Sequence, residues 1–338
     1  MNINLNNKTI LITGAAGFVG AYLTLHVADK YPNAKIIGVD NLNLYYDVTL
    51  KEHRLFLLED KTNFAFQKAD IADRIAMEHI FVGHNPSIVV NLAAQAGVRY
   101  SITNPDAYMD SNITGFFNIL ELCRKYPVEH LVYASSSSVY GLNEKIPYSV
   151  HDKTDTPVSL YAATKKSNEL TAHAYSALYG IPCTGLRFFT VYGPAGRPDM
   201  AYFSFTDLMR EGKKIQLYNN GNMKRDFTYI DDIITGVVNV INRPPLSNYA
   251  IYNIGNNASV KLIDFVDILE RSLINEGVIT HPTERELLPM QPGDVYQTYA
   301  DVDDLENEFG FKPSTSLDDG LGKFAKWYRK YYIDNEGK

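Results

Sequence analysis

A glycine-rich turn near the N-terminus constrains the fold of this chain more than any other feature. The sequence ILITGAAGFVG runs from an apolar, β-branched stretch into glycines at positions 14, 17 and 20. Glycine lets the backbone turn sharply from a strand into a helix, and the free N–H groups at the start of that helix attract a phosphate. The spacing is GxxGxxG, whereas the commoner dinucleotide fingerprint is GxGxxG. A tight turn that binds nothing is the alternative, so a second residue must support this motif.

An acidic residue supplies that support at the end of the next predicted strand. Residues 35–39, KIIGV, are apolar, and Asp40 follows them 20 residues after Gly20. A carboxylate here accepts hydrogen bonds from the adenosine ribose of NAD and repels the 2′-phosphate of NADP. Residues 41–44 contain no lysine or arginine. The two motifs together predict NAD, with Asp40 as an ordinary turn residue as the alternative.

Apolar runs alternate with helical patterns through the first half of the chain, which predicts a parallel sheet wrapped by helices on both faces. From about residue 192 prolines recur and the elements shorten. We therefore expect a doubly wound α/β (Rossmann) domain over residues 1–190. A smaller, mixed α/β lobe should follow over 191–338, with some late segments returning to the main sheet. Strands are predicted at 9–12, 35–39, 63–68, 88–92, 130–135, 182–188 and 214–218, and helices at 107–126, 161–179, 202–211 and 262–274.

Composition excludes several classes of function. The formal net charge is −7, whereas a non-specific nucleic-acid binder needs a basic face. Cys123 and Cys183 stand far apart without metal-ligand spacing, so we expect buried thiols and no metal site. No run of about 18 apolar residues suggests a membrane span. The N-terminus lacks the pattern of a signal peptide, so a cytoplasmic location is the expectation.

Two groups of hydroxyl side chains indicate chemistry. The sequence YASSSSVYG, residues 133–141, places four serines where a predicted strand ends. Tyr161 and Lys165 are one turn apart on a predicted helix and therefore share a face. A nearby ammonium favours the phenolate of a tyrosine, and such a pair can take a proton from a hydroxyl. Because YxxxK is common by chance, this pair must be interpreted together with the serines.

Combined, these motifs resemble the extended short-chain dehydrogenase/reductase family, in particular its nucleotide-sugar epimerases and dehydratases. The resemblance covers nearly the whole chain. Its motifs are TGAAGFVG, NLAA at 91–94, the serine cluster, YAATK at 161–165, RFFTVYGP at 187–194, GRPDMA at 196–201, KRDFTYIDD at 224–232 and QPGD at 291–294.

The resemblance implies a catalytic role for three residues. Tyr161 would be the base, Lys165 its tuner and the anchor of the nicotinamide ribose, and Ser136 the partner of the reacting hydroxyl. The relatives bind a UDP-sugar and are mostly homodimers that pair the helices at 107–126 and 161–179. Besides Tyr161 and Lys165, the implied NAD contacts are Gly14, Ala16, Gly17, Phe18, Val19, Asp40, Asn41, Asp70, Ile71, Leu92, Ala93 and Ala94.

The resemblance also implies contacts to the UDP moiety. Arg225 matches an arginine that pairs with the diphosphate, with a surface salt bridge as the alternative. Asp294 matches a carboxylate near the uridine ribose, and Gln291 stands where many relatives have arginine. Gln216 lies in the segment that flanks the uracil. Arg99 lies in the substrate-side loop, where a solvated charge is the alternative.

The residues after Ser136 distinguish between the reactions of the family. Members share a first step that leaves a 4-keto sugar; dehydratases then use an Asp-Glu pair beside the catalytic Ser/Thr, and decarboxylases a glutamate. This chain has Ser137 and Ser138 instead. The simplest outcome is epimerisation at C4, with NAD regenerated in each turnover and held tightly. A 4,6-dehydratase and a non-catalytic NAD-binding regulator are the less favoured alternatives.

Three features of the sequence favour UDP-glucuronate as the sugar. Residues 39–55 look like the long loop of the group that acts on this substrate, GRPDMA is typical of it, and Thr190 replaces the asparagine usual in glucose epimerases. Hydroxyls can hold a C6 carboxylate without abstracting protons. We expect Ser137, Ser138 and Thr190 to do so, with Arg197 nearby as a cation or gate. Epimerases of UDP-glucose or UDP-N-acetylglucosamine remain the nearest alternative.

Overall fold

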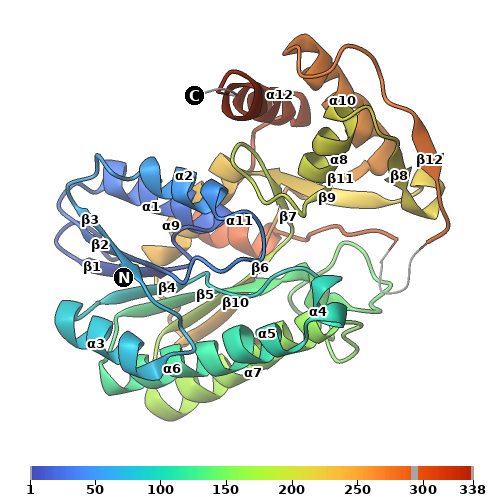
Figure 1. Cartoon of the computed structure of the whole chain (residues 1–338). Helices are drawn as coiled ribbons and strands as arrows, with labels where there is room; N and C mark the ends of the chain where they lie inside the picture. The colour runs from blue at the N-terminus through green and yellow to red at the C-terminus, as the bar shows by residue number, and fades with distance from the viewer. Residues whose placement is uncertain (1, 291–295, 336–338) are drawn as a thin grey trace.

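A seven-stranded parallel sheet forms the centre of the computed structural model, which describes residues 2–290 and 296–335 (Figure 1). The strands follow the order β10-β6-β5-β4-β1-β2-β3, and every neighbouring pair is parallel. The chain reverses direction across the sheet between β1 and β4, so a ligand crevice is expected at the carboxyl ends of these strands. The strands are β1 (Thr9–Thr13), β2 (Lys35–Asp40), β3 (Phe64–Lys68), β4 (Ile88–Asn91), β5 (His130–Ser136), β6 (Cys183–Phe188) and β10 (Tyr249–Ile254).

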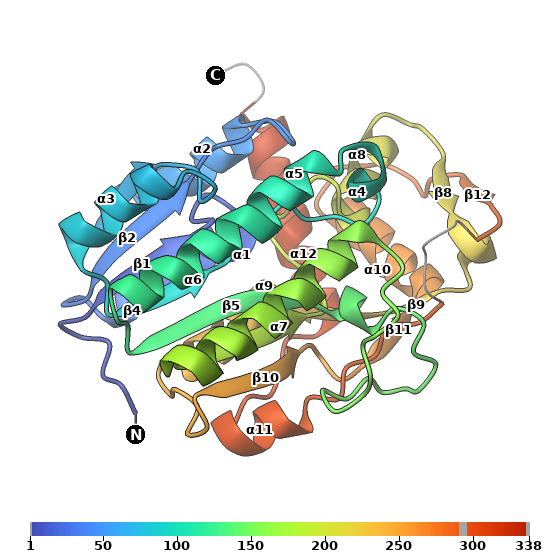
Figure 2. The ribbon, with the colours of Figure 1, turned by 90° about the horizontal axis from the view of Figure 1, so that it is seen from below.

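Helices cover both faces of this sheet, which explains why its strands are continuous apolar runs. In β1, Ile10 and Ile12 belong to the core on one face and Leu11 to the core on the other. Figure 2 shows α3, α6 and α7 side by side on one face. The doubly wound α/β fold predicted from the sequence is confirmed. One face carries α1 (Phe18–Lys30), α2 (Thr49–Phe56), α9 (Ile230–Ile241) and α11 (Asp303–Phe309), and the other α3 (Arg74–His84), α6 (Phe116–Lys125) and α7 (Leu160–Tyr179).

The C-terminal half forms a smaller lobe above one end of the sheet and also contributes to the sheet itself. Strand β10 pairs with β6, and α9 packs against α1. Within the lobe, Phe227 stacks on Phe265 with ring centroids 4.1 Å apart. The division at residue 190 stays a prediction. The lobe contains the sheet β11-β9-β7 (Ser259–Lys261, Lys224–Tyr229, Thr190–Tyr192), the pair β12-β8 (Arg285–Leu287, Ile215–Leu217), α8 (Ala201–Arg210), α10 (Leu262–Asn275) and α12 (Leu317–Tyr328).

Two segments differ from the helices and loops expected from the sequence. The helix expected at 107–126 is three pieces, α5 (Asp106–Tyr108), a π-helix η1 (Met109–Gly115) and α6. At the widened turn the Asn112 side chain binds the backbone of Gln95 at 2.8 and 3.0 Å, which a regular helix would not require. The loop expected at 39–55 contains α2, since Asp47 accepts the backbone N–H of Thr49 at 2.9 Å. Short elements complete the fold: α4 (Tyr100–Thr103), η2 (Ser137–Tyr140), η3 (Tyr218–Gly221) and η4 (Arg329–Ile333).

Within residues 2–290 and 296–335, no helix combines the length and apolar character needed to cross a bilayer. In this part of the chain no three His, Cys, Asp or Glu side chains gather as a metal site would require. Cys123 and Cys183 are free thiols and both are buried.

Candidate active site

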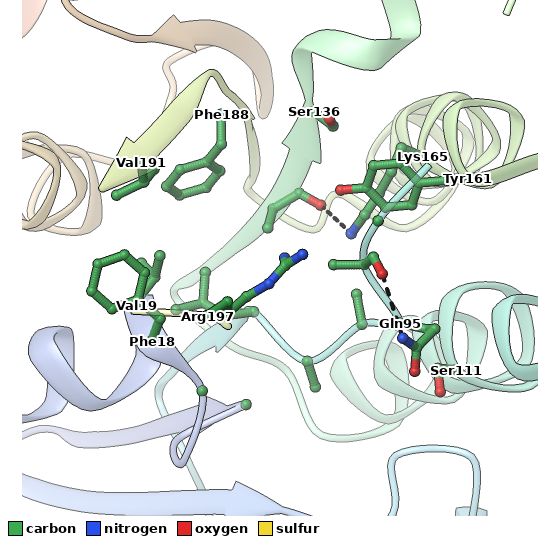
Figure 3. Close-up of a pocket in the computed structure, with 18 of the residues that line it drawn as sticks. Phe18, Val19, Gln95, Ser111, Ser136, Tyr161, Lys165, Phe188, Val191 and Arg197 are labelled. Carbon is green, nitrogen blue, oxygen red and sulfur yellow. Dashed lines mark hydrogen bonds between the residues drawn. The ribbon is translucent and has the colours of Figure 1, made fainter. Parts of the chain in front are cut away.

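A cavity of about 480 Å³ lies at the carboxyl ends of the central strands, between the sheet and the C-terminal lobe (Figure 3). It brings together side chains that are far apart in the sequence. The residues predicted from the sequence that line it are Gly14, Gly17, Phe18, Val19, Asp40, Asn41, Asp70, Ile71, Leu92, Ala93, Ala94, Ser136, Ser137, Ser138, Tyr161, Lys165, Thr190, Arg197 and Arg225.

The glycine turn forms one wall of the cavity and has a shape that only glycine permits. Gly14 has φ +73°, and a Cβ there would stand 2.8 Å from the backbone nitrogen of Ala93. Gly20 is equally confined, since a Cβ would meet the carbonyl oxygen of Gly14 at 2.0 Å. No described side chain caps α1, which begins at Phe18, so its first N–H groups are available to a phosphate. This cradle fits the diphosphate of a dinucleotide.

Asp40 lies beside this turn and is oriented by backbone groups. Its carboxylate accepts hydrogen bonds from the N–H of Ala16 at 3.2 Å and of Leu42 at 2.9 Å. Asn41 in turn donates to Asp70 at 2.8 Å, so the ends of β2 and β3 are joined. These carboxylates and amides form a polar edge suited to a ribose and an adenine.

Lys51 lines the same end of the cavity, and sequence reasoning missed it. It lies on α2, where its Nζ donates to the backbone and side-chain oxygens of Asn43 at 2.8 and 2.7 Å. Burial lowers the pKa of Lys51, and the nearby charge of Asp40 acts in the opposite direction. Residues 41–44 contain no basic side chain, and Lys51 lies further along in a segment expected to be a loop. In α2, Leu50, Lys51 and Arg54 are the buried residues, a pattern of helical period that could have revealed them.

The catalytic candidates occupy the other end of the cavity, at the end of β5 and the start of α7. Lys165 donates to the carbonyl oxygen of Ala134 at 2.8 Å, and Ser138 donates to the hydroxyl of Ser136 at 2.9 Å. Burial lowers the pKa of Lys165 to about 8. Figure 3 shows Tyr161 and Lys165 side by side at the edge of the open space. The end of β5 is thereby tied to α7 by the lysine expected to act in catalysis.

The electrostatic environment of Tyr161 differs from the simplest expectation. Burial raises the pKa of Tyr161, whereas the hydroxyl of Ser136 and the charge of Arg197 act to lower it, and Asp199 adds to the increase. The role of Lys165 as tuner of this tyrosine therefore stays a prediction. Among the described residues, the charge of Arg197 is the one that favours the phenolate of Tyr161 here.

A buried ion pair lies directly behind the serine cluster. Arg187 contacts both carboxylate oxygens of Glu169 at 2.8 and 2.9 Å, and Ser135 donates to the same carboxylate at 2.7 Å. Both charged side chains are almost fully buried. Ser135 therefore attaches β5 to α7, and it lines the cavity together with Ser137 and Ser138.

Arg197 extends into the space in front of Tyr161 and Lys165 (Figure 3). Its Nε lies 2.9 Å from Asp199, and the hydroxyl of Tyr45 donates to Asp199 at 3.2 Å. Burial alone would raise the pKa of Asp199, but the charge of Arg197 holds it below its usual value. Burial and Asp199 together raise the pKa of Tyr45 to about 12. Tyr45 lies in the segment 39–55 and Asp199 in the GRPDMA motif, but neither was named from the sequence as a functional candidate.

Several predicted contacts lie at the margin of the cavity or beyond it. Arg225 lines it and donates to the carbonyls of Lys224 and Tyr296 at 2.8 and 3.2 Å. Arg99 and Gln216 do not line it; the guanidinium of Arg99 lies 5.0 Å from the ring of Tyr218, whose hydroxyl donates to Gln216 at 3.2 Å. Ala16, a predicted NAD contact, is not part of the cavity lining, but its backbone N–H donates to Asp40. Gln291 and Asp294 lie outside the described residues.

Comparison with known proteins identifies the class. Residues 10–255 match the NAD dependent epimerase/dehydratase family. Protein CapI of Staphylococcus aureus is 50% identical over 339 residues, covering 96% of this chain and 99% of that protein. A probable UDP-glucuronate 4-epimerase of Rhizobium meliloti is 44% identical over 339 residues, covering 95% of this chain and 97% of that protein. The chain belongs to the NAD dependent epimerase/dehydratase family, and its cofactor is NAD.

Solved structures give the same result and add a second substrate class. UDP-glucuronic acid 4-epimerase from Bacillus cereus, in complex with UDP-glucuronic acid and NAD, superposes with a TM-score of 0.87 at 32% identity, covering 96% of this chain and all of that one. UDP-glucose 4-epimerase from Thermotoga maritima, with UDP-glucose, has a TM-score of 0.82 at 28% identity, covering 95% of this chain and 99% of that chain. Relatives of both kinds share the fold, so the sugar must be argued from the site.

Proposed function

We propose that this protein is a UDP-glucuronate 4-epimerase, which interconverts UDP-glucuronate and UDP-galacturonate. The observation that carries the proposal is the composition of the catalytic end of the cavity. Tyr161 and Ser136 are present, but the neighbouring positions carry the hydroxyls of Ser137, Ser138 and Thr190 and the cation of Arg197. Such a set can bind a carboxylate, and it adds no Asp or Glu beside Ser136 that could act as the acid or base of an elimination.

The cofactor would lie along the polar edge described above. The glycine turn and the N-terminus of α1 would hold its diphosphate, and Asp40 its adenosine ribose. Bound NAD supplies the group that accepts and returns hydride at the sugar C4. The chain's own residues orient the sugar, exclude water and move the proton of the C4 hydroxyl.

Proton transfer is assigned to Tyr161 with Ser136 as its partner. Ser136 accepts a hydrogen bond from Ser138, which leaves its own hydroxyl proton free to point toward the sugar or toward Tyr161. The phenolate of Tyr161 would accept the proton of the C4 hydroxyl. The phenol would return that proton after the 4-keto intermediate has rotated to present its other face. Among the described residues, the carboxylates that line the cavity are Asp40 and Asp70, at its ribose end. A second acid or base for dehydration is therefore missing from this part of the chain.

The C6 carboxylate of the sugar is assigned to the hydroxyls of Ser137, Ser138 and Thr190. Ser137 and Ser138 lie on η2, whereas Thr190 begins β7 across the cavity. Arg197 would approach the same carboxylate with a charge that Asp199 already neutralises in part. Rigid binding matters because a 4-keto uronate is a β-keto acid that loses CO2 easily when it is free to rotate.

The homodimer remains part of the proposal. Phe117 on α6 and Leu170 and Leu178 on α7 expose large apolar surface on the same side of the sheet. Pairing of these helices between two copies would cover that surface. Light scattering during gel filtration should give twice the chain mass, and Leu170→Glu with Leu178→Glu should give monomers. Monomeric wild-type protein would contradict the pairing.

The test of the proposed function is turnover of three sugars without added cofactor. The purified protein is incubated separately with UDP-glucuronate, UDP-glucose and UDP-N-acetylglucosamine, and the anomeric protons are followed by NMR. UDP-galacturonate should form fastest. A pentose product would indicate decarboxylation, and preferential conversion of a neutral sugar would move the assignment to the neighbouring class. Inactivity with every sugar, with NAD still bound, would favour a non-catalytic NAD-binding protein.

A further inference from the structure

The segment that follows β2 lies against the turn that precedes Arg197. Arg54, on α2, is fully buried and donates to the carbonyl oxygens of Ala195 and Gly196, each at 2.8 Å. It also donates to Ala16 at 3.1 Å and to the hydroxyl of Tyr46 at 2.7 Å. One guanidinium therefore joins the glycine turn, the segment after β2 and the turn before Arg197.

The buried charge of Arg54 is unusual because the groups that accept its hydrogen bonds are neutral. Within residues 2–290 and 296–335, no carboxylate forms an ion pair with it. A buried cation is costly unless its donors are hydrogen-bonded, and here four of the five N–H groups donate to neutral oxygens. The planar fork of arginine holds two successive carbonyls in a fixed geometry, which the point charge of a lysine ammonium does not reproduce. We therefore expect Arg54 to fix the position of the Ala195 and Gly196 carbonyls.

The turn that Arg54 holds has little freedom of its own. Ala195 has φ +50°, a left-handed conformation that is uncommon for any residue except glycine. At Gly196 a Cβ would lie 1.6 Å from the hydroxyl of Tyr202. Arg197 is the next residue, so the direction in which its side chain leaves the backbone is set by this turn.

The segment after β2 is also connected to the guanidinium of Arg197, through Asp199. Tyr45 donates to Asp199, and Asp199 forms an ion pair with Arg197. The ring of Tyr45 packs against Tyr100 with centroids 4.6 Å apart, which limits its own movement. Arg197 is thus fixed at its backbone by Arg54 and at its guanidinium, through Asp199, by Tyr45.

We propose that Tyr45 and Arg54 are positioning residues that hold Arg197 in front of the reacting sugar. The segment after the ribose-binding strand then helps to determine which sugar the enzyme accepts. The inference rests on the proposed function in one respect, because it takes the C6 carboxylate to be the group that Arg197 meets. A neutral sugar in the same cavity would depend much less on where this guanidinium points.

The test separates positioning from ordinary structural support by comparing two ligands. Affinity for UDP-glucuronate and UDP-glucose is measured by calorimetry on the NAD-loaded protein, in a Tyr161→Phe background that stops turnover. Tyr45→Phe removes one hydroxyl and keeps the ring that packs on Tyr100. Loss of a hydrogen bond to a charged group should weaken UDP-glucuronate binding about tenfold and UDP-glucose binding less than about twofold.

A double-mutant cycle shows whether Tyr45 acts through Arg197. Arg197→Met alone should abolish most of the preference for UDP-glucuronate. Adding Tyr45→Phe to Arg197→Met should then change the affinity by less than about twofold, because coupled residues are not additive. Full additivity, or equal weakening of both ligands by Tyr45→Phe, would overturn the inference.

Arg54→Lys extends the test to the backbone contact and keeps the charge. It should lower the UDP-glucuronate preference at least as much as Tyr45→Phe, since a lysine ammonium does not reproduce the planar geometry in which Arg54 holds both carbonyls. Arg271→Met, which removes an exposed arginine paired with Asp318 far from the cavity, is the matched control and should leave both affinities unchanged. If Arg54→Lys lowers the melting temperature while the ratio of the two affinities stays the same, Arg54 is structural only.

The outcome can be distinguished from failure of the proposed function. If the Tyr161→Phe protein binds UDP-glucuronate no better than UDP-glucose, the assignment of the sugar fails, whatever Tyr45→Phe does. If UDP-glucuronate is preferred and neither Tyr45→Phe nor Arg54→Lys changes that preference, only the positioning inference fails.

Discussion

The two ends of the cavity are built in different ways. At the cofactor end, the glycine turn and the strand ends beside it present backbone groups and the carboxylates of Asp40 and Asp70. At the sugar end, side chains from β5, α7, β7 and the turn before α8 converge, and their hydrogen bonds connect residues far apart in the chain. The first end is specified by local sequence, whereas the second depends on how the lobe is placed against the sheet.

The sugar end also holds the groups that would exchange a proton with the substrate. At the sugar end, burial raises the pKa of Tyr161 and lowers the pKa of Lys165 to about 8. Groups with shifted pKa values are typical of catalytic sites, since a proton must move there near neutral pH. Substitutions at the cofactor end should therefore act by distorting its shape and weakening NAD binding. Substitutions at the sugar end should act by removing groups that bind the sugar or transfer the proton.

Removal of the proposed base should give the largest effect. Tyr161→Phe keeps the ring beside Tyr108 and removes the hydroxyl, so kcat should fall by about 10³-fold, within the range known for acid–base catalysis. NAD should remain bound, which absorbance of the denatured extract would show. Retention of more than a tenth of the wild-type kcat would contradict the role of Tyr161.

A methyl group in the glycine turn should break the cofactor end. Gly14→Ala places a Cβ 2.8 Å from the nitrogen of Ala93 at φ +73°, so NAD should be lost and stability should fall by about 1–3 kcal/mol. Measurements are the NAD content after gel filtration and the urea midpoint. Gly83→Ala on α3 is the control, because nothing lies within 4 Å of its Cβ; it should stabilise the protein by about 0.5–1 kcal/mol. Full NAD retention by Gly14→Ala would contradict the cradle.

Loss of the hydroxyls at the sugar end should have a smaller and selective effect. Ser137→Ala combined with Thr190→Val should raise KM for UDP-glucuronate at least about tenfold, since two hydrogen bonds to a charged group are removed. The KM for a neutral UDP-sugar should change little in steady-state assays. An unchanged KM for UDP-glucuronate would mean that these hydroxyls do not bind its carboxylate.

The pH dependence of kcat should show the smallest effect, through Lys165. Burial lowers the pKa of Lys165 to about 8, so the folded enzyme loses this ammonium as pH rises past that value. Any contribution of its charge to catalysis is present below pH 8 and lost above it, and kcat should fall several-fold by about pH 9. Lys165→Arg, which stays charged, should lack this decline even if its activity is lower. An identical descending limb in Lys165→Arg would assign the decline to another group.

Short sequence patterns located several groups that line the cavity, whereas other residues in and around it were not found from the sequence. The glycine turn, Asp40, the serine cluster and the Tyr161–Lys165 pair are short patterns with a direct physical reason, and the structure places all of them on one cavity. Lys51 and Arg54 were missed because residues 39–55 were treated as a loop, although the buried positions of α2 follow a helical period. The contact from Tyr45 to Asp199 joins residues 154 positions apart, and no local pattern predicts it. Arg99 and Gln216 were placed on the substrate by resemblance, and they lie beyond the cavity lining.

One labelling experiment tests the central claim most directly. UDP-glucuronate that carries deuterium at C4 is incubated with the protein as purified, without added cofactor, in ordinary water. The proposed mechanism removes and returns the same hydrogen on opposite faces of C4, so UDP-galacturonate should form with the deuterium still at C4. Product that has lost the label, or a pentose in place of a uronate, would contradict C4 epimerisation by this site.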